Sequence, residues 1–307
     1  MSAIRIGLDI GGTKIEAAAV RGESEVLWRE RVATPQGDYD ASVRAVVDLV
    51  ARMAKELTLP SETPVGIGAP GSISPISGMQ RNSNSVCLNG RPFAADLERA
   101  LVRRVRMAND ANCFALAEAI AGAARGASVV FGVILGTGVG GGVVIDRVAR
   151  EGRNAVGGEF GHGQQQGIAE EALRDGRVHQ PRACYCGLVD CREQYIAAAA
   201  VEREFLARSS RALSLREIEI RASAGEDEAR DAIERWAQRV AISLADVVNL
   251  LDPDCIVLGG GASNLAAATD GMSARVAQYT FGDCMRTPIL RAQLGDSAGV
   301  IGAAWLW

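Results

Sequence analysis

Three glycine-rich turns constrain this chain more than any other feature, since each follows directly on a short apolar run. They are Gly11-Gly12-Thr13, Gly136-Thr137-Gly138 and Gly259-Gly260-Gly261. Short apolar runs that end in glycine are typical of buried strands. Glycine lets backbone N–H groups converge on an anion, and the two threonines add hydroxyl donors. One such turn usually only reverses the chain, but three at strand ends indicate binding of nucleotide phosphates.

The elements around these turns alternate between strands and helices, which is typical of an α/β protein. The predicted strands are Ile4–Asp9, Ile15–Val20, Val65–Ile67, Val129–Leu135, Val143–Ile145 and Cys255–Leu258. Apolar residues at helical spacing predict helices over 41–57 and 227–251. We place a lobe boundary near residue 115, which gives lobes 1–115 and 116–307. A tail helix over 297–307 could pack back on the first lobe.

Two other nucleotide-binding patterns do not fit. Gly136, Gly138 and Gly141 satisfy the G-x-G-x-x-G dinucleotide fingerprint, but that fingerprint requires a helix after the glycines. The β-branched run Val143–Ile145 favours a strand instead, so the dehydrogenase interpretation is rejected. Lys14 follows Gly-Gly-Thr but lacks the spacing of a Walker A loop.

Longer segments around the turns resemble the motifs of one family. LDIGGTKIEAAAV, GVILGTGVGGGVVID and IVLGGG resemble the two phosphate motifs and the adenosine motif of the sugar kinase/actin superfamily. With NSNSVCLNG (82–90), VRMANDANCFALAEA (105–119) and GAAWLW (302–307), the whole chain resembles the ROK family, most closely its fructokinase-like branch. This resemblance implies a two-lobed sugar kinase/actin-like (ribonuclease H-like) α/β fold with a nucleotide cleft between the lobes. The ATP-binding residues that it implies are Asp9, Gly11, Gly12, Thr13, Lys14, Gly136, Thr137, Gly138, Gly259 and Gly260.

Asp110 is the candidate catalytic base, because a sugar hydroxyl that attacks a phosphate needs a carboxylate to orient it and take its proton. Its place at the start of a predicted helix also suits an N-cap. The resemblance favours catalysis, since Asn109-Asp110 matches the sugar-binding Asn and catalytic Asp of the family. Asp9 would repel a nucleotide at the first turn unless a cation intervenes, so we expect Mg²⁺ there.

Further sugar-binding residues are implied by the resemblance. Glu159 and His162 match the E-x-G-H element of the family, in which the Glu binds sugar hydroxyls and the His touches sugar and metal. Glu193 matches a further sugar-binding Glu, and Gly71 lies in a loop that we expect to close over the sugar. Weaker candidates, for which a loop role is equally open, are Asn82 and Asn84.

Cys184, Cys186 and Cys191 place three thiolates within eight residues, a pattern typical of zinc, which needs a fourth ligand. The chain has two histidines, His162 and His179. Distance along the sequence favours His179, whereas the resemblance favours His162, because the family binds zinc through E-x-G-H and C-x-C-G-x-x-G-C-x-E. We choose His162. Zinc held by three cysteines and one histidine has no open position, so its expected role is structural.

The zinc loop departs from the family pattern at two places. Asp190 stands where the pattern has glycine before the third cysteine, and Gln164–Gln166 follows the histidine. Neither removes a ligand, but both could change the shape of the loop and the preferred sugar.

The expected function is therefore phosphorylation of a hexose by ATP with Mg²⁺, and fructose is the first choice as acceptor. Glucose, mannose and N-acetylhexosamines stay open, because a pocket of Asn, Asp, Glu and His could bind any hexose. The resemblance makes a homodimer plausible. A protein that binds sugar without catalysis is disfavoured, since Asp9, Asp110 and the phosphate glycines are all present.

A sugar-responsive repressor of the same family is the rival from another class. Such regulators carry a helix-turn-helix domain before the kinase-like part, whereas here the first strand begins at Ile4. A net charge of −4 and a pI near 5.4 also disfavour a nucleic-acid partner. Without a basic leader or an apolar run of ~20 residues, a cytoplasmic protein that does not bind membranes is expected.

Overall fold

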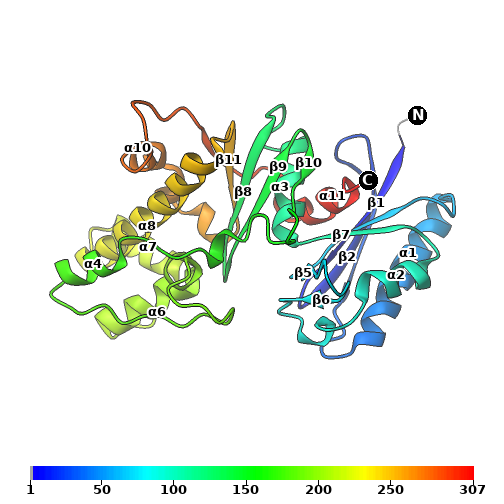
Figure 1. Ribbon diagram of the computed structural model, residues 1–307, viewed down its shortest axis with the longest axis horizontal. Helices are drawn as coiled ribbons and strands as arrows, with labels where there is room; N and C mark the ends of the chain where they lie inside the picture. The colour runs from blue at the N-terminus through cyan, green and yellow to red at the C-terminus, as the bar shows by residue number, and fades with distance from the viewer. Residues whose placement is uncertain (1–2) are drawn as a thin grey trace. The chain divides into compact units, whose positions relative to one another are not determined.

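The computed structural model describes residues 3–307, which form an α/β protein, as the sequence predicted (Figure 1). The chain divides into two compact units. The first contains the residues up to 128, then 142–158 and 293–307, and the second contains 129–141 and 159–292. Within residues 3–307, no helix combines the length and apolar character that a membrane span requires.

The first unit is built on a five-stranded sheet with the order β3-β2-β1-β4-β7. Its strands are β1 (Ile4–Ile10), β2 (Lys14–Arg21), β3 (Glu25–Ala33), β4 (Val65–Gly68) and β7 (Val105–Ala108). β1 pairs antiparallel with β2 and parallel with β4, and β4 pairs parallel with β7. The short strands β5 (Ser72–Ile73) and β6 (Gln80–Arg81) form a separate ribbon.

Helices cover both faces of this sheet, with α1 and α2 on one side and α11 on the other (Figure 1). The helical segments of the first unit are α1 (Tyr39–Leu57), η1 (Val86–Leu88), α2 (Phe93–Leu101), α3 (Asp110–Ala121), η4 (Gly295–Ser297) and α11 (Ala298–Ala304). α1 begins where the Asp38 side chain accepts a hydrogen bond from the Ala41 N–H at 2.9 Å. Its apolar stripe, spaced by three and four residues, is buried against the sheet.

Alternation along β1 decides which side chains meet which helix. The residues that join the core shared with α1 are Ile6, Leu8 and Ile10. Gly7 and Asp9 point to the opposite face, because side chains alternate along a strand. There α11 lies so close that a Cβ at Gly7 would be 2.0 Å from the carbonyl oxygen of Val300. The small residues of β1 and α11 thus allow the close packing that sets the surroundings of Asp9.

The second sheet has the order β10-β9-β8-β11-β12. Its strands are β8 (Val129–Leu135), β9 (Val139–Ile145), β10 (Val148–Ala149), β11 (Cys255–Gly259) and β12 (Ile289–Arg291). β11 runs parallel to both β8 and β12. β9 begins in the second unit and ends in the first, where it pairs with β10. A strand thus follows the second glycine turn, in agreement with the rejection of a dinucleotide-binding fingerprint.

The other elements of the second unit are η2 (Phe160–His162), α4 (Ile168–Arg174), α5 (Glu193–Ile196), α6 (Ala198–Ser209), α7 (Leu215–Ser223), α8 (Asp227–Leu251), η3 (Gly261–Asn264), α9 (Ala266–Thr269) and α10 (Met272–Ala277). α8 has the predicted bounds. Its buried stripe includes Ile233, Trp236, Val240, Leu244 and Val247. The Trp236 indole N–H donates to the carbonyl oxygen of Ile196 at 2.9 Å, which ties α8 to the end of α5.

The predicted lobe boundary near residue 115 falls inside α3, so it would cut a helix that the structure keeps whole within the first unit. α3 begins at Asp110 rather than after it, because the side chain of Asn109 caps the helix. The helical tail is shorter than predicted and ends at Ala304. In the first unit α11 packs against α3 and β1.

Replacing Gly302 by alanine is expected to destabilise the protein, because a Cβ there would lie 1.8 Å from the carbonyl oxygen of Cys113 in α3. Overpacking of this kind costs about 1–3 kcal/mol or more. Urea unfolding measures the loss. Gly261→Ala is the matched control, since nothing lies within 4 Å of its Cβ position. If the two variants are equally stable, the contact between α11 and α3 is less tight than described.

Candidate active site and metal centre

The first unit places Asp9 and the first glycine turn together at the end of β1. Hydrogen bonds fix the turn: the Gly11 N–H donates to the Lys14 carbonyl at 2.9 Å, and Thr34 Oγ1 donates to the Gly11 carbonyl at 2.7 Å. Gln36 Nε2 donates to the Gly12 carbonyl at 3.2 Å. Side chains from outside the turn therefore hold two of its carbonyl groups. The conformation of the turn is fixed by the protein itself and does not require a ligand.

Asp9 lies in a crowded, acidic environment. Burial raises its pKa to about 6, with further contributions from the charges of Asp110 and Glu16, while Lys14 and Arg31 oppose the rise. On the other side, a Cβ at Gly299 of α11 would lie 2.5 Å from Asp9 Oδ2. A carboxylate whose pKa is raised by burial and by the charges of neighbouring carboxylates favours a bound cation, and oxygen ligands of this type suit Mg²⁺.

Glu16 is a functional candidate that sequence reasoning missed. Its carboxylate is fully buried on β2, opposite Asp9 in the pairing with β1. Arg29 and Arg31 of β3 both donate to it, and Lys14 Nζ lies 3.9 Å away. A glutamate within an otherwise apolar strand, beside a strand carrying arginines at alternate positions, is the signal that could have revealed this cluster.

Asn109 and Asp110 stand at the start of α3, after β7. Asn109 Oδ1 accepts from the Asn112 N–H at 2.7 Å, so Asn109 is the cap and its amide N–H groups stay available as donors. Asp110 Oδ1 accepts from the Ala111 N–H at 2.9 Å. Crowding by protein atoms raises the pKa of Asp110, whereas this backbone N–H opposes the rise. The residue nevertheless keeps an exposed surface, so a substrate can reach it.

Gly71 occupies a position that only glycine fits. Its φ is +82°, and a Cβ would lie 2.2 Å from the Arg81 carbonyl oxygen. Asn82, also with positive φ, and Asn84 are exposed on the segment after β6. The weaker candidates therefore lie near Gly71 in the chain fold, without a contact that assigns them a ligand.

In the second unit, the turn after β8 lies against Glu193. The Gly136 N–H donates to the Gly138 carbonyl at 3.0 Å. Glu193 Oε2 accepts from the Val139 N–H at 2.9 Å, and a Cβ at Gly138 would lie 2.6 Å from the same oxygen. Thr137 lies between these two glycines. The carboxylate predicted for sugar binding thus also supports the second glycine turn.

The third glycine turn follows β11. Gly260 has a φ of +81°, and a Cβ there would lie 2.3 Å from the Leu135 carbonyl oxygen of β8. The Ser263 hydroxyl donates to the Gly260 carbonyl at 2.7 Å. Gly259 ends the strand itself. The second and third turns consequently meet at one edge of the sheet in the second unit.

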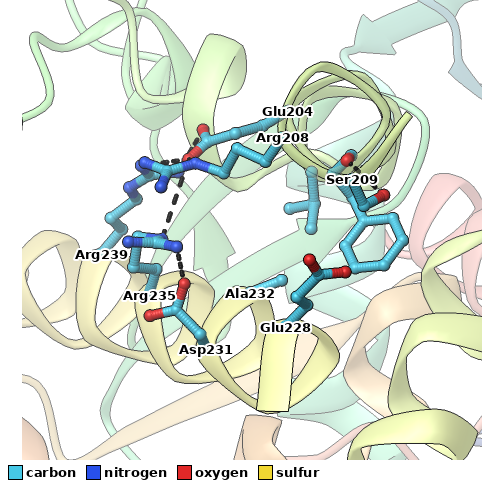
Figure 2. Close-up of a pocket in the computed structure, with 10 residues that line it drawn as sticks. Glu204, Arg208, Ser209, Glu228, Asp231, Ala232, Arg235 and Arg239 are labelled. Atoms are coloured by element: carbon cyan, nitrogen blue, oxygen red, sulfur yellow. Dashed lines mark hydrogen bonds and ion pairs between the residues drawn. The ribbon is translucent and has the colours of Figure 1, made fainter. Parts of the chain in front are cut away.

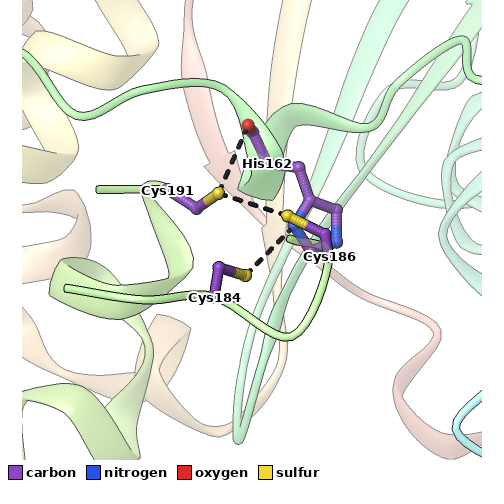
Figure 3. Close-up of side chains that lie close together, drawn as sticks. All are labelled: His162, Cys184, Cys186 and Cys191. Atoms are coloured by element: carbon purple, nitrogen blue, oxygen red, sulfur yellow. Dashed lines mark hydrogen bonds between the residues drawn. The ribbon is translucent and has the colours of Figure 1, made fainter. Parts of the chain in front are cut away.

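The structure brings His162 together with the three cysteines of the loop, and their ligand atoms all lie within 4.8 Å of one another (Figure 3). Cys184 Sγ is 3.6 Å from His162 Nδ1, and Cys186 Sγ is 3.5 Å from Cys191 Sγ. Zn–S and Zn–N bonds of about 2.3 and 2.0 Å at tetrahedral angles would place ligands roughly 3.5–3.8 Å apart. The donor set and its spacing therefore fit zinc.

The other ring nitrogen of His162 also has a partner. Nε2 lies 3.0 Å from the Tyr185 hydroxyl, which would fix the ring for coordination through Nδ1. Burial raises the pKa of Tyr185 to about 12, and the charges of Glu193, Cys184 and Glu159 add to the rise. Both predicted sugar-binding glutamates thus lie near Tyr185. His162 would have to release Tyr185 in order to touch a sugar.

His179 lies outside the cysteine cluster. Its Nε2 is 2.8 Å from Asp190 Oδ2, and Asp190 also accepts from the Arg182 N–H and the Tyr195 hydroxyl. The φ of Asp190 is +57°, a conformation that favours glycine and explains why glycine is usual there. The departure from the family pattern thus builds a hydrogen-bond network beside the loop.

Arg192 is a second residue that the sequence did not single out. Its guanidinium donates to the Phe160 carbonyl at 3.3 Å and to Asp246. Its backbone N–H donates to the Gly163 carbonyl at 2.8 Å. Through these hydrogen bonds Arg192 holds the segment that carries Glu159 and His162 in place.

Comparison with known proteins agrees with these features. Residues 5–307 match the ROK family. N-acetyl-D-glucosamine kinase of Escherichia coli O127:H6 is 36% identical over 301 residues, which covers 98% of each chain. The ROK hexokinase of Thermus thermophilus has a TM-score of 0.85 at 33% identity, over 99% of this chain and 97% of that one.

A ROK family glucokinase from Streptomyces griseus, solved with glucose and AMPPNP, has a TM-score of 0.74 at 30% identity and is covered over 98% of both chains. The fold predicted from the sequence, the two-lobed sugar kinase/actin-like α/β fold, is confirmed by these neighbours.

Proposed function

The chain belongs to the ROK family, and we propose that it transfers a phosphoryl group from ATP to a hydroxyl group of a hexose. The observation that carries this proposal is the cluster of Asp9 and Asp110 beside the first glycine turn. A carboxylate with a raised pKa next to a phosphate-binding turn suits a base that accepts a hydroxyl proton. The names of the three relatives described above, an N-acetyl-D-glucosamine kinase, a hexokinase and a glucokinase, support the same chemistry.

Asp110 acts as the base in this proposal. Its carboxylate accepts the proton of the attacking hydroxyl, and its hydrogen bond from Ala111 holds it in place. Asn109, whose oxygen caps α3, directs its amide N–H groups to sugar oxygens. Asp9 would hold Mg²⁺, which supplies charge neutralisation for the phosphates when it is bound.

The other residues that we assign to sugar and nucleotide belong to the second unit. Glu159 and Glu193 accept hydrogen bonds from sugar hydroxyls, and the glycine turns after β8 and β11 receive the nucleotide. Zinc on His162 and the cysteines would fix the loop between these glutamates. It takes no part in the transfer, because four protein ligands leave no open position.

Fructose is the acceptor that we propose, giving fructose 6-phosphate. This choice rests on the resemblance to the fructokinase-like branch alone, which the segments NSNSVCLNG, VRMANDANCFALAEA and GAAWLW carry. The names of the relatives point instead to N-acetylglucosamine and glucose, and these are the competing acceptors. A coupled assay with ATP should rank fructose first in kcat/KM among fructose, glucose, mannose and N-acetylhexosamines. A preference of tenfold or more for N-acetylglucosamine or glucose would contradict fructose as the acceptor but leave the proposed kinase activity in place.

Binding of Mg²⁺–nucleotide should weaken in acid because Asp9 takes up a proton near pH 6. With that pKa, the ionised fraction of Asp9 falls about tenfold between pH 7 and pH 5. Calorimetry with AMPPNP and Mg²⁺ at the two pH values measures the loss. The control variant Asp9→Asn should bind Mg²⁺–AMPPNP more weakly. Because it lacks the Asp9 carboxylate, its remaining pH dependence reports the protonation of the nucleotide alone. If the affinity of the wild type and that of Asp9→Asn depend equally on pH, the assignment of Asp9 as a Mg²⁺ ligand is contradicted.

A further inference from the structure

A cavity of about 400 Å³ in the second unit lies apart from every residue assigned to phosphoryl transfer. Its walls come from α4, α5, α6 and α8 and from the segment 175–182, which precedes the cysteine loop. Ligand sites typically have volumes of ~300–1,000 Å³, so a small molecule fits. Neither the glycine turns nor the glutamates proposed for sugar binding line it.

Charge distinguishes this cavity from an ordinary surface hollow. The cations on its walls are Arg177, Arg182, Arg203, Arg208 and Arg239. The carboxylates on its walls are Glu171, Asp175 and Glu204. Five arginines against three carboxylates leave two positive charges in surplus, although the whole chain has a net charge of −4. The surplus equals the charge of one phosphate dianion.

Buried ion pairs hold the floor of the cavity in place. The Arg239 side chain, 5% exposed, donates to both Glu171 and Glu204, with contacts of 2.6–3.0 Å. Burial disfavours the charged form of Glu204, but Arg239 and Arg182 lower its pKa to about 2. The carboxylate of Glu204 in the floor therefore stays ionised at neutral pH.

A smaller cavity of about 190 Å³ shares Glu204, Arg208 and Arg239 as a wall, and Figure 2 shows how the arginines gather there. Arg235 also approaches Asp175, Glu171 and Glu204 at 3.5–4.0 Å. Burial lowers the pKa of Arg235, and the charge of Arg208 lowers it further. Arg208, Arg235 and Arg239 thus share Glu204, and Arg235 also forms an ion pair with Asp231.

Arg203 and Arg177 are the cations best placed to meet a ligand. Arg203 is exposed on α6, and its one hydrogen bond among the described residues goes to Gln194 Oε1 at 3.2 Å. No carboxylate within residues 3–307 forms an ion pair with it. The Arg177 side chain is 51% exposed and shares Asp175 with Arg208 and Arg235. Both guanidinium groups can turn toward an anion.

We propose that this cavity is an accessory site for a phosphate group, either inorganic phosphate or a phosphate monoester. Guanidinium groups bind phosphate oxygens in pairs, and the buried Arg239 with its carboxylates keeps the site rigid. A plain ion-pair network that ties α4, α6 and α8 together would require neither the surplus charge nor the open volume.

The site also touches the cysteine loop. His179 lines the cavity and contacts Asp190, the residue before Cys191, and Arg182 joins the cavity to Asp190 through its backbone N–H. An anion that draws Arg182 or His179 into the cavity therefore acts on the loop that holds Glu193. Binding of an anion in the accessory site can therefore shift Asp190 and, through the cysteine loop, the residues proposed for sugar binding.

Calorimetric titration of the zinc-loaded full chain with inorganic phosphate tests the site. AMPPNP, Mg²⁺ and fructose are present at saturation, so that phosphate does not report on the nucleotide site. One equivalent of phosphate should bind. The double variant Arg177→Ala/Arg203→Ala should weaken it at least tenfold, while Arg230→Ala, an exposed arginine of α8 outside both cavities, leaves it unchanged.

Fructose 6-phosphate, with fructose alone as its control, distinguishes the two sources of the phosphate group. Tighter binding than inorganic phosphate assigns the site to a sugar phosphate, and equal binding assigns it to the phosphate group alone. Absence of binding, or binding that the double variant does not weaken, overturns the site. The experiment measures phosphate affinity, and the substituted arginines have no assigned role in phosphoryl transfer. Its outcome therefore does not depend on whether the protein is a kinase.

Discussion

Replacing Asp110 by asparagine is expected to lower turnover of hexose and ATP by at least about 10²–10⁴-fold. Asparagine keeps the shape of the side chain and can still accept the Ala111 N–H, but it cannot take the proton of the attacking hydroxyl. Sugar binding should change little, because Asn109, Glu159 and Glu193 are intact. Steady-state kinetics and calorimetric titration with the hexose measure the two effects separately.

Asp48→Asn is the matched control for this loss, since Asp48 is an exposed carboxylate on α1. It should keep the turnover of the wild type. Retention of more than a tenth of the activity in Asp110→Asn would contradict the role of base. Parallel loss of turnover and sugar binding would instead make Asp110 a binding residue.

Replacing Cys191 by serine is expected to remove zinc and to disorder the loop between His162 and Glu193. Cys191 is fully buried, and its sulfur lies 3.5 Å from that of Cys186. Zinc affinity should fall by more than the roughly 10–100-fold that loss of an outer partner costs. The KM for the hexose should rise more than kcat falls, because the loop supports sugar-binding residues rather than Asp110.

Three variants make this result specific. Cys284→Ser changes an exposed cysteine outside the cluster and should retain zinc. His162→Ala should lose zinc, whereas His179→Ala should retain it, as their places in the structure require. Metal analysis by mass spectrometry gives the zinc content of each protein. A zinc-free wild type, or zinc retained by His162→Ala, would contradict the proposed metal centre.

The elements that the sequence predicted best are those with a simple period or a sharp end. β8 and α8 have the predicted bounds, because a β-branched run ends at glycine and a long apolar stripe ends before Pro253. The strand after the second glycine turn follows from Val143–Ile145 in the same way. Local patterns suffice where the residues that decide an element lie within it.

Features that depend on distant residues were harder to predict. Asn109 rather than Asp110 caps α3, since two neighbouring polar residues compete for one position and the packing of the helix decides. The lobe boundary was misplaced because α3 packs against α11, which lies far away in the sequence.

The charged networks show the same limit. Glu16 is buried with Arg29 and Arg31, and Arg239 with Glu171 and Glu204, although each side chain alone would be assigned to the surface. Sequence distance favoured His179 as zinc ligand. In the structure His179 instead forms a hydrogen bond with Asp190, whose backbone is left-handed. These arrangements arise from tertiary contacts between elements that the sequence predicts only one at a time.

The most direct measurement follows the γ-phosphate of labelled ATP in the presence of Mg²⁺ and fructose, glucose or N-acetylglucosamine. The label is expected to appear on the hexose, with transfer that depends on Asp110. Release of labelled inorganic phosphate without any labelled sugar, or equal transfer by Asp110→Asn, would contradict a hexose kinase that uses this carboxylate as its base.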